Sequence, residues 1–406
     1  MSTTERLYYR DSHLTEFEAR VQSVTESVSG WCAVTLDRTA FYPTGGGQPS
    51  DTGLLDSAPV VECIDQEDGS VLHVIQGRAP QVGATVKGRV DWERRLDHIQ
   101  QHTGQHILSQ AFIALYGAET RSFRMMDEAS EIDLALQDPT DERIEKAIGL
   151  ANSIIWEDRP VQVRLVTAEE AAELPLRKDS ERAGELRIIE IEDFDLSPCG
   201  GTHAQRTGEV GLIATRHWER AKGLVRIEFV AGRRALADYA RANKTARRVA
   251  SLFSIARDEA PLAVARLLEE NKQLSRRIRT LEEAAARTEG DELVRTALPG
   301  PNNGLRLIAR TFDGREAEAL KHLALAVVSH PQTIALLGSR DGATARLVFA
   351  RSTDAPGDMN ALMREACSLL DGRGGGRPDM AQGGGHNVHK LDEAIAAAAR
   401  LLAPNQ

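Results

Sequence analysis

Two short motifs that lie far apart in the chain contain the residue types that bind transition metals. The stretch "HTGQHIL" begins at His102 and holds His-x-x-x-His, and "SPCGGTH" begins at Ser197 and holds Cys-x-x-x-His. A spacing of four places both imidazoles on one face of a helix. The two glycines of the second motif let the backbone turn both of its ligands towards one ion. If the motifs share an ion, the fold must bring these distant segments together.

The four candidate ligands are one thiolate and three imidazoles, a set that suits zinc. They are His102, His106, Cys199 and His203. Each pair alone is weak evidence, because exposed or core histidines reach this spacing by chance. Four protein ligands are typical of a closed structural zinc site, whereas a zinc-bound water needs an open position. The sequence leaves open whether zinc would activate water or only hold the pocket and its ligand.

His98 lies one turn before His102, on the same face of the predicted helix. Three interpretations remain: a fifth ligand, a side chain that hydrogen-bonds to a ligand, or a buried polar residue. We favour the hydrogen-bonding role.

The secondary-structure pattern changes at about Arg94. Residues 15–92 contain short strand-like segments separated by Gly and Asp at hairpin-like intervals, which predicts a small β-barrel. From Arg94 to Gly117 the spacing is helical. Helices then alternate with strands, and several strands follow one another directly, as in an α+β layer domain. A strand hairpin is expected over residues 208–232.

Residues 261–287 carry an apolar seam with alternating spacings of three and four, as in a coiled coil. The seam consists of Val264, Leu267, Asn271, Leu274, Ile278, Leu281 and Ala285. An Asn at an a position commonly fixes the register and the oligomeric state. Two alternatives stay open: a coiled-coil homodimer, and a helical hairpin formed with the preceding helix of the same chain.

These changes predict a multidomain α+β protein. We expect an N-terminal β-barrel over residues 1–92, a zinc-containing α+β domain over 93–257, a helical or coiled-coil linker over 258–297 and a C-terminal α/β domain over 298–406. The turn-rich "LPGPNNG" at 298–304 marks the last boundary.

Composition narrows the function and the compartment. A net charge of −10 argues against indiscriminate nucleic-acid binding but allows a local basic face. Four cysteines without disulfide-framework spacing predict a reducing cytoplasm; they are Cys32, Cys63, Cys199 and Cys367. No apolar run approaches the length of a membrane span, and the first residues contain no apolar signal segment. We therefore expect no membrane partner.

A run of three glycines lies in "AFYPTGGGQPSDTG", residues 40–53. Without a following Lys-Ser/Thr and a helix, this run is not a phosphate-binding P-loop, and a flexible hairpin loop would explain the glycines alone. Gln48, however, offers an amide donor and a carbonyl acceptor beside bare backbone that can approach a ligand closely.

Taken in order, "FYPTGGGQPSDTG", "HTGQHIL", "CGGTH", "TGEVG" and "VRIEFVAG" resemble the editing domain of alanyl-tRNA synthetase. The whole chain is similar to the freestanding alanyl-tRNA editing proteins of the larger type. "GGGRPDMAQGGG" resembles the tail domain that the synthetase shares with DHH-type phosphoesterases. Only about ninety residues precede the histidine pair, too few for an aminoacylation domain, and the acidic motifs of the phosphoesterases are absent.

The resemblance implies a zinc-dependent hydrolase that removes serine, and in some members glycine, from mischarged tRNA(Ala). A synthetase pocket built for alanine cannot strongly reject glycine or serine, so a second, hydrolytic site raises fidelity. Alanine would be spared because it lacks the hydroxyl that a polar pocket can hold. The alternative is a non-catalytic, zinc-stabilised module that binds tRNA.

The resemblance also implies roles for residues near the metal. We expect catalytic roles for Gln48, Thr44 and His98, and substrate contacts from Gly45, Gly46, Gly47, Ser130, Asp133 and Thr202. Thr44 stands where family members often carry an acidic residue, and its hydroxyl would bond a serine side chain or only a turn amide. Asp133 is equally explained by a solvated strand edge. Thr202 would orient His203 or line the pocket.

Basic residues gather after the second ligand pair. Between Ala204 and Ala250, eleven Lys and Arg residues stand against four acidic ones. We expect a face that meets acceptor-stem phosphates, with a solvated helix as the alternative. In the C-terminal domain, arginines flank a glycine run that would be a phosphate or sugar contact, a mobile loop or a dimer contact. The predicted RNA contacts are Lys222, Arg226, Arg373 and Arg377.

Overall fold

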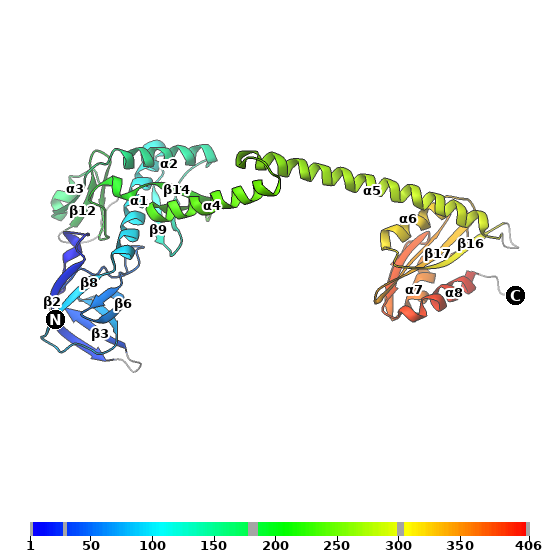
Figure 1. The fold of residues 1–406 in the computed structure, drawn as a ribbon, viewed down its shortest axis with the longest axis horizontal. Coiled ribbons are helices and arrows are strands. Elements are labelled where there is room, and N and C mark those ends of the chain that lie inside the picture. Colours follow the sequence, from blue (N-terminus) through cyan, green and yellow to red (C-terminus); the bar gives the residue numbers. More distant parts are fainter. Residues whose placement is uncertain (1–2, 27–30, 178–185, 299–303, 403–406) are drawn as a thin grey trace. The chain divides into compact units, whose positions relative to one another are not determined.

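The computed structural model describes residues 3–26, 31–177, 186–298 and 304–402. The chain is a multidomain α+β protein (Figure 1) and divides into two compact units, Met1–Val249 and Ala250–Gln406. Within the described ranges, no helix has the length and apolar character needed to cross a membrane.

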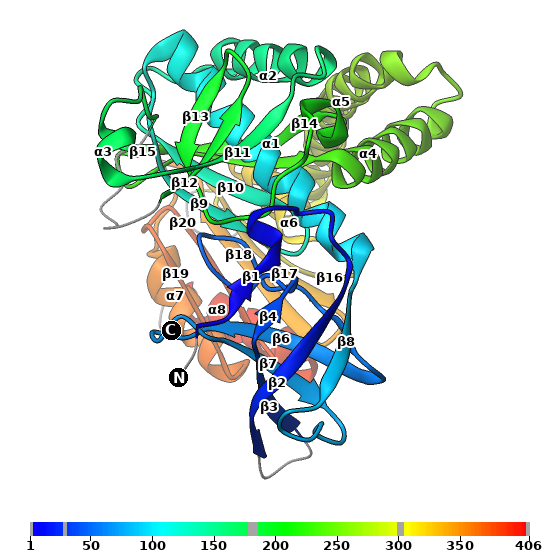
Figure 2. The same cartoon turned by 90° about the vertical axis from the view of Figure 1, so that its left-hand side faces the viewer.

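The first unit begins with the predicted β-barrel, which is closed and six-stranded (Figure 2). Its strands follow the order β2 (Glu16–Glu26), β3 (Trp31–Leu36), β7 (Val71–Gln76), β6 (Ala58–Asp65), β5 (Gly53–Leu55) and β8 (Thr85–Val90). Alternation along β8 buries Val86 and Val90. The three-residue β5 was not expected from the sequence. A short parallel pair, β1 (Glu5–Arg6) with β4 (Arg38–Thr39), lies beside η1 (Leu7–Tyr9).

The predicted histidine-bearing helix is α1 (Trp92–Tyr116). The Asp91 side chain caps its start by accepting bonds from the amides of Glu93 and Arg94. Gly117 ends it in the left-handed conformation, with φ of 63°. Because α1 is buried along most of its length, its polar side chains face other parts of the protein instead of water.

Two antiparallel sheets contact α1. The first has the order β14 (Ile213–Ala221), β15 (Leu224–Ala231), β10 (Ser130–Leu134) and β9 (Thr120–Met125), and its β14–β15 pair is the predicted hairpin. One core joins this sheet to α1 and to α2 (Asp141–Trp156). The second sheet has the order β11 (Val161–Val166), β12 (Leu186–Ile191) and β13 (Asp195–Pro198). The helix α3 (Ala168–Ala172) packs on this sheet through Ala171, whereas η2 (Thr207–Val210) contacts α1 and α2.

The second unit is a five-stranded sheet with helices on both faces. Its strand order is β16 (Arg306–Asp313), β17 (Thr333–Asp341), β18 (Thr344–Arg351), β20 (Met380–Gly385) and β19 (Gly372–Gly376). Alternate residues of β17 enter two different cores, one with α6 (Ala317–Val328) and one with α7 (Met359–Leu369) and α8 (Leu391–Leu402). The glycine run after Asp371 is therefore not a loop, because it forms β19 and pairs with β20.

The predicted coiled-coil segment lies within one helix, α5 (Ala260–Thr296), which follows α4 (Gly232–Leu252) and η3 (Arg257–Glu259). Most of the apolar seam is exposed, including Leu267, Leu274 and Ile278. The last turns differ, since Val294 enters a core with residues of α6 and the sheet. The end of α5 is thus part of the C-terminal core.

A buried ion pair joins the barrel to α1. Arg95 and Asp51 are both fully buried, and Arg95 Nε lies 3.1 Å from Asp51 Oδ1. The same guanidinium donates to the carbonyl oxygens of Ser12 and Ala40. This cluster ties the first turn of α1 to the barrel, because a buried guanidinium must keep all of these partners.

We predict that Arg95→Met lowers the free energy of unfolding of the first unit by about 3–5 kcal/mol, because it leaves Asp51 buried without its counter-charge. The control is Arg38→Met, which removes an exposed pair with Glu5 and should cost less than about 1 kcal/mol. Urea unfolding followed by tryptophan fluorescence measures both, since all four tryptophans lie in the first unit. Equal losses in the two variants would contradict the prediction.

Candidate metal centre

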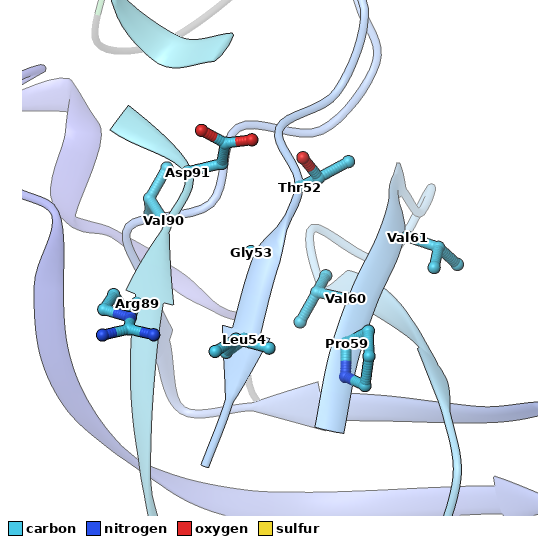
Figure 3. A pocket seen from close by; sticks show the side chains of 9 residues that line it. All are labelled: Thr52, Gly53, Leu54, Pro59, Val60, Val61, Arg89, Val90 and Asp91. Atoms are coloured by element: carbon cyan, nitrogen blue, oxygen red, sulfur yellow. The ribbon is translucent and has the colours of Figure 1, made fainter. Parts of the chain in front are cut away.

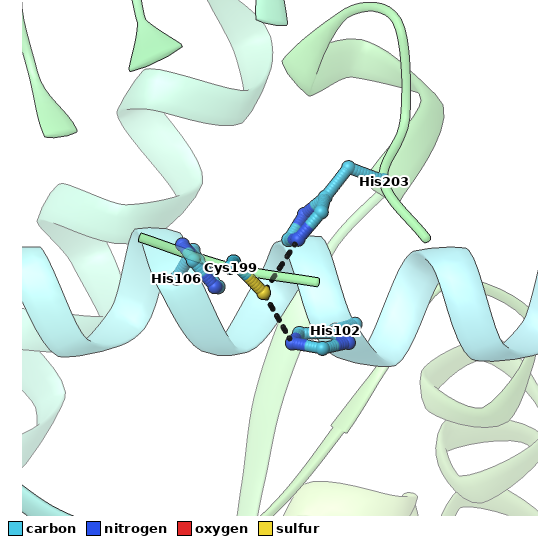
Figure 4. A group of neighbouring side chains, drawn as sticks. All are labelled: His102, His106, Cys199 and His203. Carbon is cyan, nitrogen blue, oxygen red and sulfur yellow. Dashed lines mark hydrogen bonds between the residues drawn. The ribbon is translucent and has the colours of Figure 1, made fainter. Parts of the chain in front are cut away.

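The structure brings the four predicted ligands together. Figure 4 shows His102 and His106 on α1, with Cys199 and His203 facing them from the loop after β13. Their ligand atoms all lie within 4.8 Å of one another. Cys199 Sγ is 3.4 Å from His102 Nε2 and 3.3 Å from His203 Nε2. Tetrahedral zinc with bonds of 2.0–2.3 Å separates its ligand atoms by roughly 3.3–3.6 Å, so this group could hold a metal ion.

Close packing against α1 explains one of the two glycines between Cys199 and His203. A Cβ on Gly201 would lie 2.1 Å from Cε1 of His102, whereas a Cβ on Gly200 would meet only the Tyr9 hydroxyl, at 3.6 Å. Gly201 therefore allows the loop to approach the His102 ring. The buried Arg187 fixes this loop by donating hydrogen bonds to the carbonyl oxygens of Cys199 and Gly201.

Each of the three imidazoles has a partner at Nδ1. His102 Nδ1 is 2.7 Å from Gln48 Oε1, His106 Nδ1 is 3.1 Å from Asp195 Oδ2, and His203 Nδ1 is 3.3 Å from Thr103 Oγ1. A neutral imidazole that keeps its proton on Nδ1 presents the lone pair of Nε2 to a metal. The Nε2 atoms of His102 and His203 lie beside the Cys199 sulfur. The donor set and its outer partners thus fit a metal ion.

The electrostatics favour the thiolate that metal binding requires. Burial alone would raise the pKa of Cys199, but the three surrounding imidazoles outweigh burial and hold this pKa well below its usual value. Burial lowers the pKa of His203 to about 3, so this ring is neutral. Burial also acts to lower the pKa of His106, yet the Cys199 thiolate and Asp195 raise it overall.

Gln48 lies inside the site and is almost completely buried. Its Oε1 accepts from His102 Nδ1 and from the amide of Thr202, and its Nε2 donates to the Thr202 hydroxyl at 2.9 Å. Gln48 therefore links the barrel to both ligand motifs. Thr202 is also buried, and both its hydroxyl and its amide bond to Gln48.

The glycine loop packs against β9, and its first two members remain open. The Gly47 carbonyl accepts from the amide of Met125, and a Cβ on Gly47 would lie 2.5 Å from the Phe123 carbonyl oxygen. Phe123 also contacts the His102 ring, with 5.4 Å between ring centroids. Gly46 has open space around it, and Gly45 has only ordinary contacts. The loop thus lies beside the metal group.

The sequence left more than one role open for Thr44 and for His98, and the structure shows the contacts of each. The Thr44 hydroxyl accepts from the amide of Ser50 at 3.1 Å, which is the turn-amide alternative. His98 is buried, and burial lowers its pKa to about 4. Its Nδ1 has no hydrogen-bond partner among the described residues, and His98 is not a member of the metal group found there.

Ser130 and Asp133 lie on opposite faces of β10. Ser130 is fully buried on the face of β10 that also carries Ile132 and Leu134, the face that packs on α1. An odd spacing along a strand puts Asp133 on the other face. There it accepts from Arg226 Nε at 2.8 Å and from the Ser122 hydroxyl at 2.7 Å.

The predicted RNA contacts fall on both units. Lys222 is exposed in the turn between β14 and β15, while Arg226 is paired with Asp133. Arg373 and Arg377 are exposed on and just after β19. At least six of the eleven basic residues between Ala204 and Ala250 make ion pairs, and these include Arg206, Arg216, Arg226, Arg233, Arg234 and Arg241. The basic excess is therefore partly neutralised.

Two surface hollows lie away from the metal group. The hollow of about 420 Å³ in Figure 3 is lined by residues of β5, β6 and β8, and none of its nine lining residues is His or Cys. A second hollow of about 500 Å³ lies in the C-terminal unit and includes Arg346, Arg373 and His386. Neither hollow includes a residue of the metal group.

Sequence reasoning missed the residues that hold the ligands in place. Asp195, Thr103 and Arg187 were not predicted, although each contacts a ligand residue. Asp195 has a weak signal, since it is a lone acid in the stretch "FDLSPCGGTH" just ahead of Cys199. Thr103 and Arg187 have no local pattern that would single them out.

Three family models match this chain. Residues 186–228 match the threonyl and alanyl tRNA synthetase second additional domain, which includes Cys199 and His203. Residues 2–94 match the model of class II (A) tRNA synthetases, and this match falls on the barrel. Residues 304–403 match the DHHA1 domain. The fold, the metal group and these three family matches together indicate the class of the protein. It belongs to the class of proteins that share domains with alanyl-tRNA synthetase.

Sequence identity to individual proteins shows which family this chain belongs to. The alanyl-tRNA editing protein AlaX-L of Pyrococcus horikoshii is 33% identical over 392 residues, which cover 93% of this chain and 94% of that protein. The alanine–tRNA ligase of Methanoregula boonei is 34% identical over 97% of this chain, but the match covers only 43% of the ligase. The C-Ala domain from Aquifex aeolicus alanyl-tRNA synthetase aligns with 24% of this chain and 91% of that structure, at 30% identity and a TM-score of 0.23. This chain belongs to the family of alanyl-tRNA editing proteins.

We predict that Gly201→Ala weakens metal binding at least tenfold, because its methyl group would displace the His102 ring. Gly200→Ala is the matched control and should bind metal like the wild type. Competition with a chromophoric chelator measures Zn²⁺ affinity in both. Unchanged affinity in the Gly201→Ala variant would show that the His102 position does not matter for binding.

Proposed function

We propose that this protein is a trans-editing hydrolase that removes serine or glycine from mischarged tRNA(Ala), with one zinc ion held by His102, His106, Cys199 and His203. The observation that supports the proposal most strongly is the convergence of these four side chains from two distant segments. The similarity to AlaX-L over nearly the whole chain supports the substrate class. In this proposal, residues 93–257 are the deacylase domain.

The side chains around the metal have separable roles in this proposal. Zinc, when bound, supplies a positive charge that can hold the aminoacyl ester or polarise a water. Gln48 holds the His102 ring and the Thr202 hydroxyl in fixed positions. Gly45 and Gly46 leave bare backbone beside the group for the small amino acid.

In this proposal, two of the buried polar atoms that lack a partner in the described part of the chain are available to the substrate or to water. The Ser130 hydroxyl and His98 Nδ1 have no hydrogen-bond partner among the described residues. A pKa of about 4 keeps His98 neutral near pH 7, so its Nδ1 can donate or accept a hydrogen bond according to the tautomer. We assign both residues to the substrate side of the site.

The RNA contacts are part of the same proposal. Lys222 on the β14–β15 turn would meet phosphates of the acceptor stem, and Arg373 and Arg377 beside β19 would meet a second part of the tRNA. A homodimer through the exposed seam of α5 or through the C-terminal domain stays a prediction, as does a cytoplasmic location.

We expect the purified chain to deacylate seryl-tRNA(Ala) or glycyl-tRNA(Ala) and to leave alanyl-tRNA(Ala) charged. Cys199→Ala should abolish turnover and lower the zinc content while the circular dichroism spectrum stays unchanged, because the barrel and the sheets do not depend on this sulfur. Release of labelled amino acid measures turnover, and elemental analysis measures zinc.

Binding without turnover of either mischarged tRNA would favour the non-catalytic tRNA-binding module. Active protein without zinc would contradict the metal assignment while leaving the deacylase in place.

Removing the positive charges of the β14–β15 turn should weaken tRNA binding and make the binding constant less dependent on salt concentration. Arg220 and Lys222 make no ion pair with any described residue, so Arg220→Ala/Lys222→Ala should lower the slope of log K against log salt by about 2. Lys87→Ala, which removes an exposed barrel lysine, is the control. An unchanged slope in the double variant would remove this turn from the RNA interface.

A further inference from the structure

The partner of His106 differs from those of the other two imidazoles. His102 faces an amide oxygen and His203 faces a hydroxyl, whereas His106 Nδ1 lies 3.1 Å from the carboxylate of Asp195. Among these three contacts, the Asp195 contact alone has a charged acceptor. Hydrogen bonds to an ionised acceptor are roughly twice as strong as bonds between neutral groups.

Asp195 is itself held rigidly. Its side chain is fully buried, and it begins β13, four residues before Cys199. The Ser197 hydroxyl donates to it at 2.9 Å, and Arg177 Nε lies 2.7 Å from Oδ1. The Ser197 hydroxyl is equally close to Oδ2, at 2.9 Å, and Arg177 Nη2 lies 3.4 Å from Oδ2. Ser197 and Arg177 together therefore hold the carboxylate against the His106 ring, which contacts Oδ2.

Arg177 competes with Asp195 for the same nitrogen of His106. Its Nη2 lies 3.2 Å from the same His106 Nδ1. A guanidinium has only donors, so a bond from Arg177 would require an unprotonated Nδ1 and would place the proton on Nε2. That tautomer cannot bind a metal through Nε2. Asp195 favours the opposite tautomer, with the proton on Nδ1 and the Nε2 lone pair free.

We propose that Asp195, held by Ser197 and Arg177, is a positioning residue that selects the metal-binding tautomer and ring orientation of His106. The inference rests on the proposal that the four-ligand group holds a metal. It assigns Asp195 no contact with tRNA. A purely structural ion pair between Asp195 and Arg177 is the competing explanation, and it predicts a loss of stability without a specific loss of metal affinity.

The test measures metal affinity in the full-length chain with Zn²⁺ and Co²⁺ as probes. Asp195→Asn should bind Zn²⁺ about 10–100-fold more weakly than the wild type, as expected for the loss of a ligand's outer partner. Its Co²⁺ complex should show a shifted and weaker visible absorption band, because the His106 ring is no longer fixed. Ser197→Ala, which only loosens the carboxylate, should show a smaller loss in the same direction.

The matched control is Asp133→Asn. It also removes a carboxylate from an arginine pair in the same unit, but Asp133 lies on the outer face of β10 and contacts no metal ligand. Its Zn²⁺ affinity and Co²⁺ spectrum should equal those of the wild type.

The outcomes separate this inference from the proposed function. Wild-type affinity in Asp195→Asn, or an equal loss in Asp133→Asn, would overturn the positioning role and leave the zinc site standing. A wild-type chain that binds neither ion would overturn both. If Asp195→Asn fails to fold, full Zn²⁺ affinity in Ser197→Ala would count against the positioning role.

Discussion

The meeting of one cysteine with three buried histidines, contributed by two distant segments, is the constraint on which the candidate site of the first unit depends. Buried groups of this kind are stable only when each polar atom has a partner and the charges balance. Two ligands come from α1 and two from the loop after β13, so the helix and the second sheet must meet at a fixed distance. Gly201 allows that distance, and the Arg95–Asp51 pair ties the first turn of α1 to the barrel.

The barrel is part of the site because of this geometry. Gln48 comes from the barrel loop, yet its amide bonds to His102 on α1 and to Thr202 in the second ligand motif. The adjoining Gly47 is bonded to β9 through backbone atoms. A chain that carried only the ligand domain would lose the partner of one imidazole and one wall of the site. This coupling gives a physical reason for the two modules to occur in one unit.

The sequence predicted the elements better than the contacts between them. Period and capping signals located the barrel strands other than β5, α1 and its end at Gly117, and the β14–β15 hairpin. The partners of the imidazoles could not be found in this way, because Gln48 and His102 are 54 residues apart and His106 and Asp195 are 89 apart. The two-residue period of a strand, by contrast, already places Asp133 and Ser130 on opposite faces of β10.

The C-terminal glycines show how one residue type permits two explanations. Glycine is favoured both in a flexible loop and in a strand that another element approaches closely. Only tertiary packing distinguishes these two explanations of a glycine run. A Cβ on Gly374 or Gly383 would lie within 3 Å of the Cys367 sulfur, so α7 rests directly on the backbone of β19 and β20. The arginines at the ends of β19 are therefore presented by a strand at the edge of a sheet.

X-ray absorption at the zinc edge of the purified full-length protein tests the central claim most directly. The four-ligand group predicts one zinc per chain, with about one sulfur at roughly 2.3 Å and about three nitrogens at roughly 2.0–2.1 Å. Replacing Cys199 with Ala should remove the sulfur shell. A first shell made only of oxygen and nitrogen in the wild type, or one with two or more sulfurs, would contradict this assignment of the site.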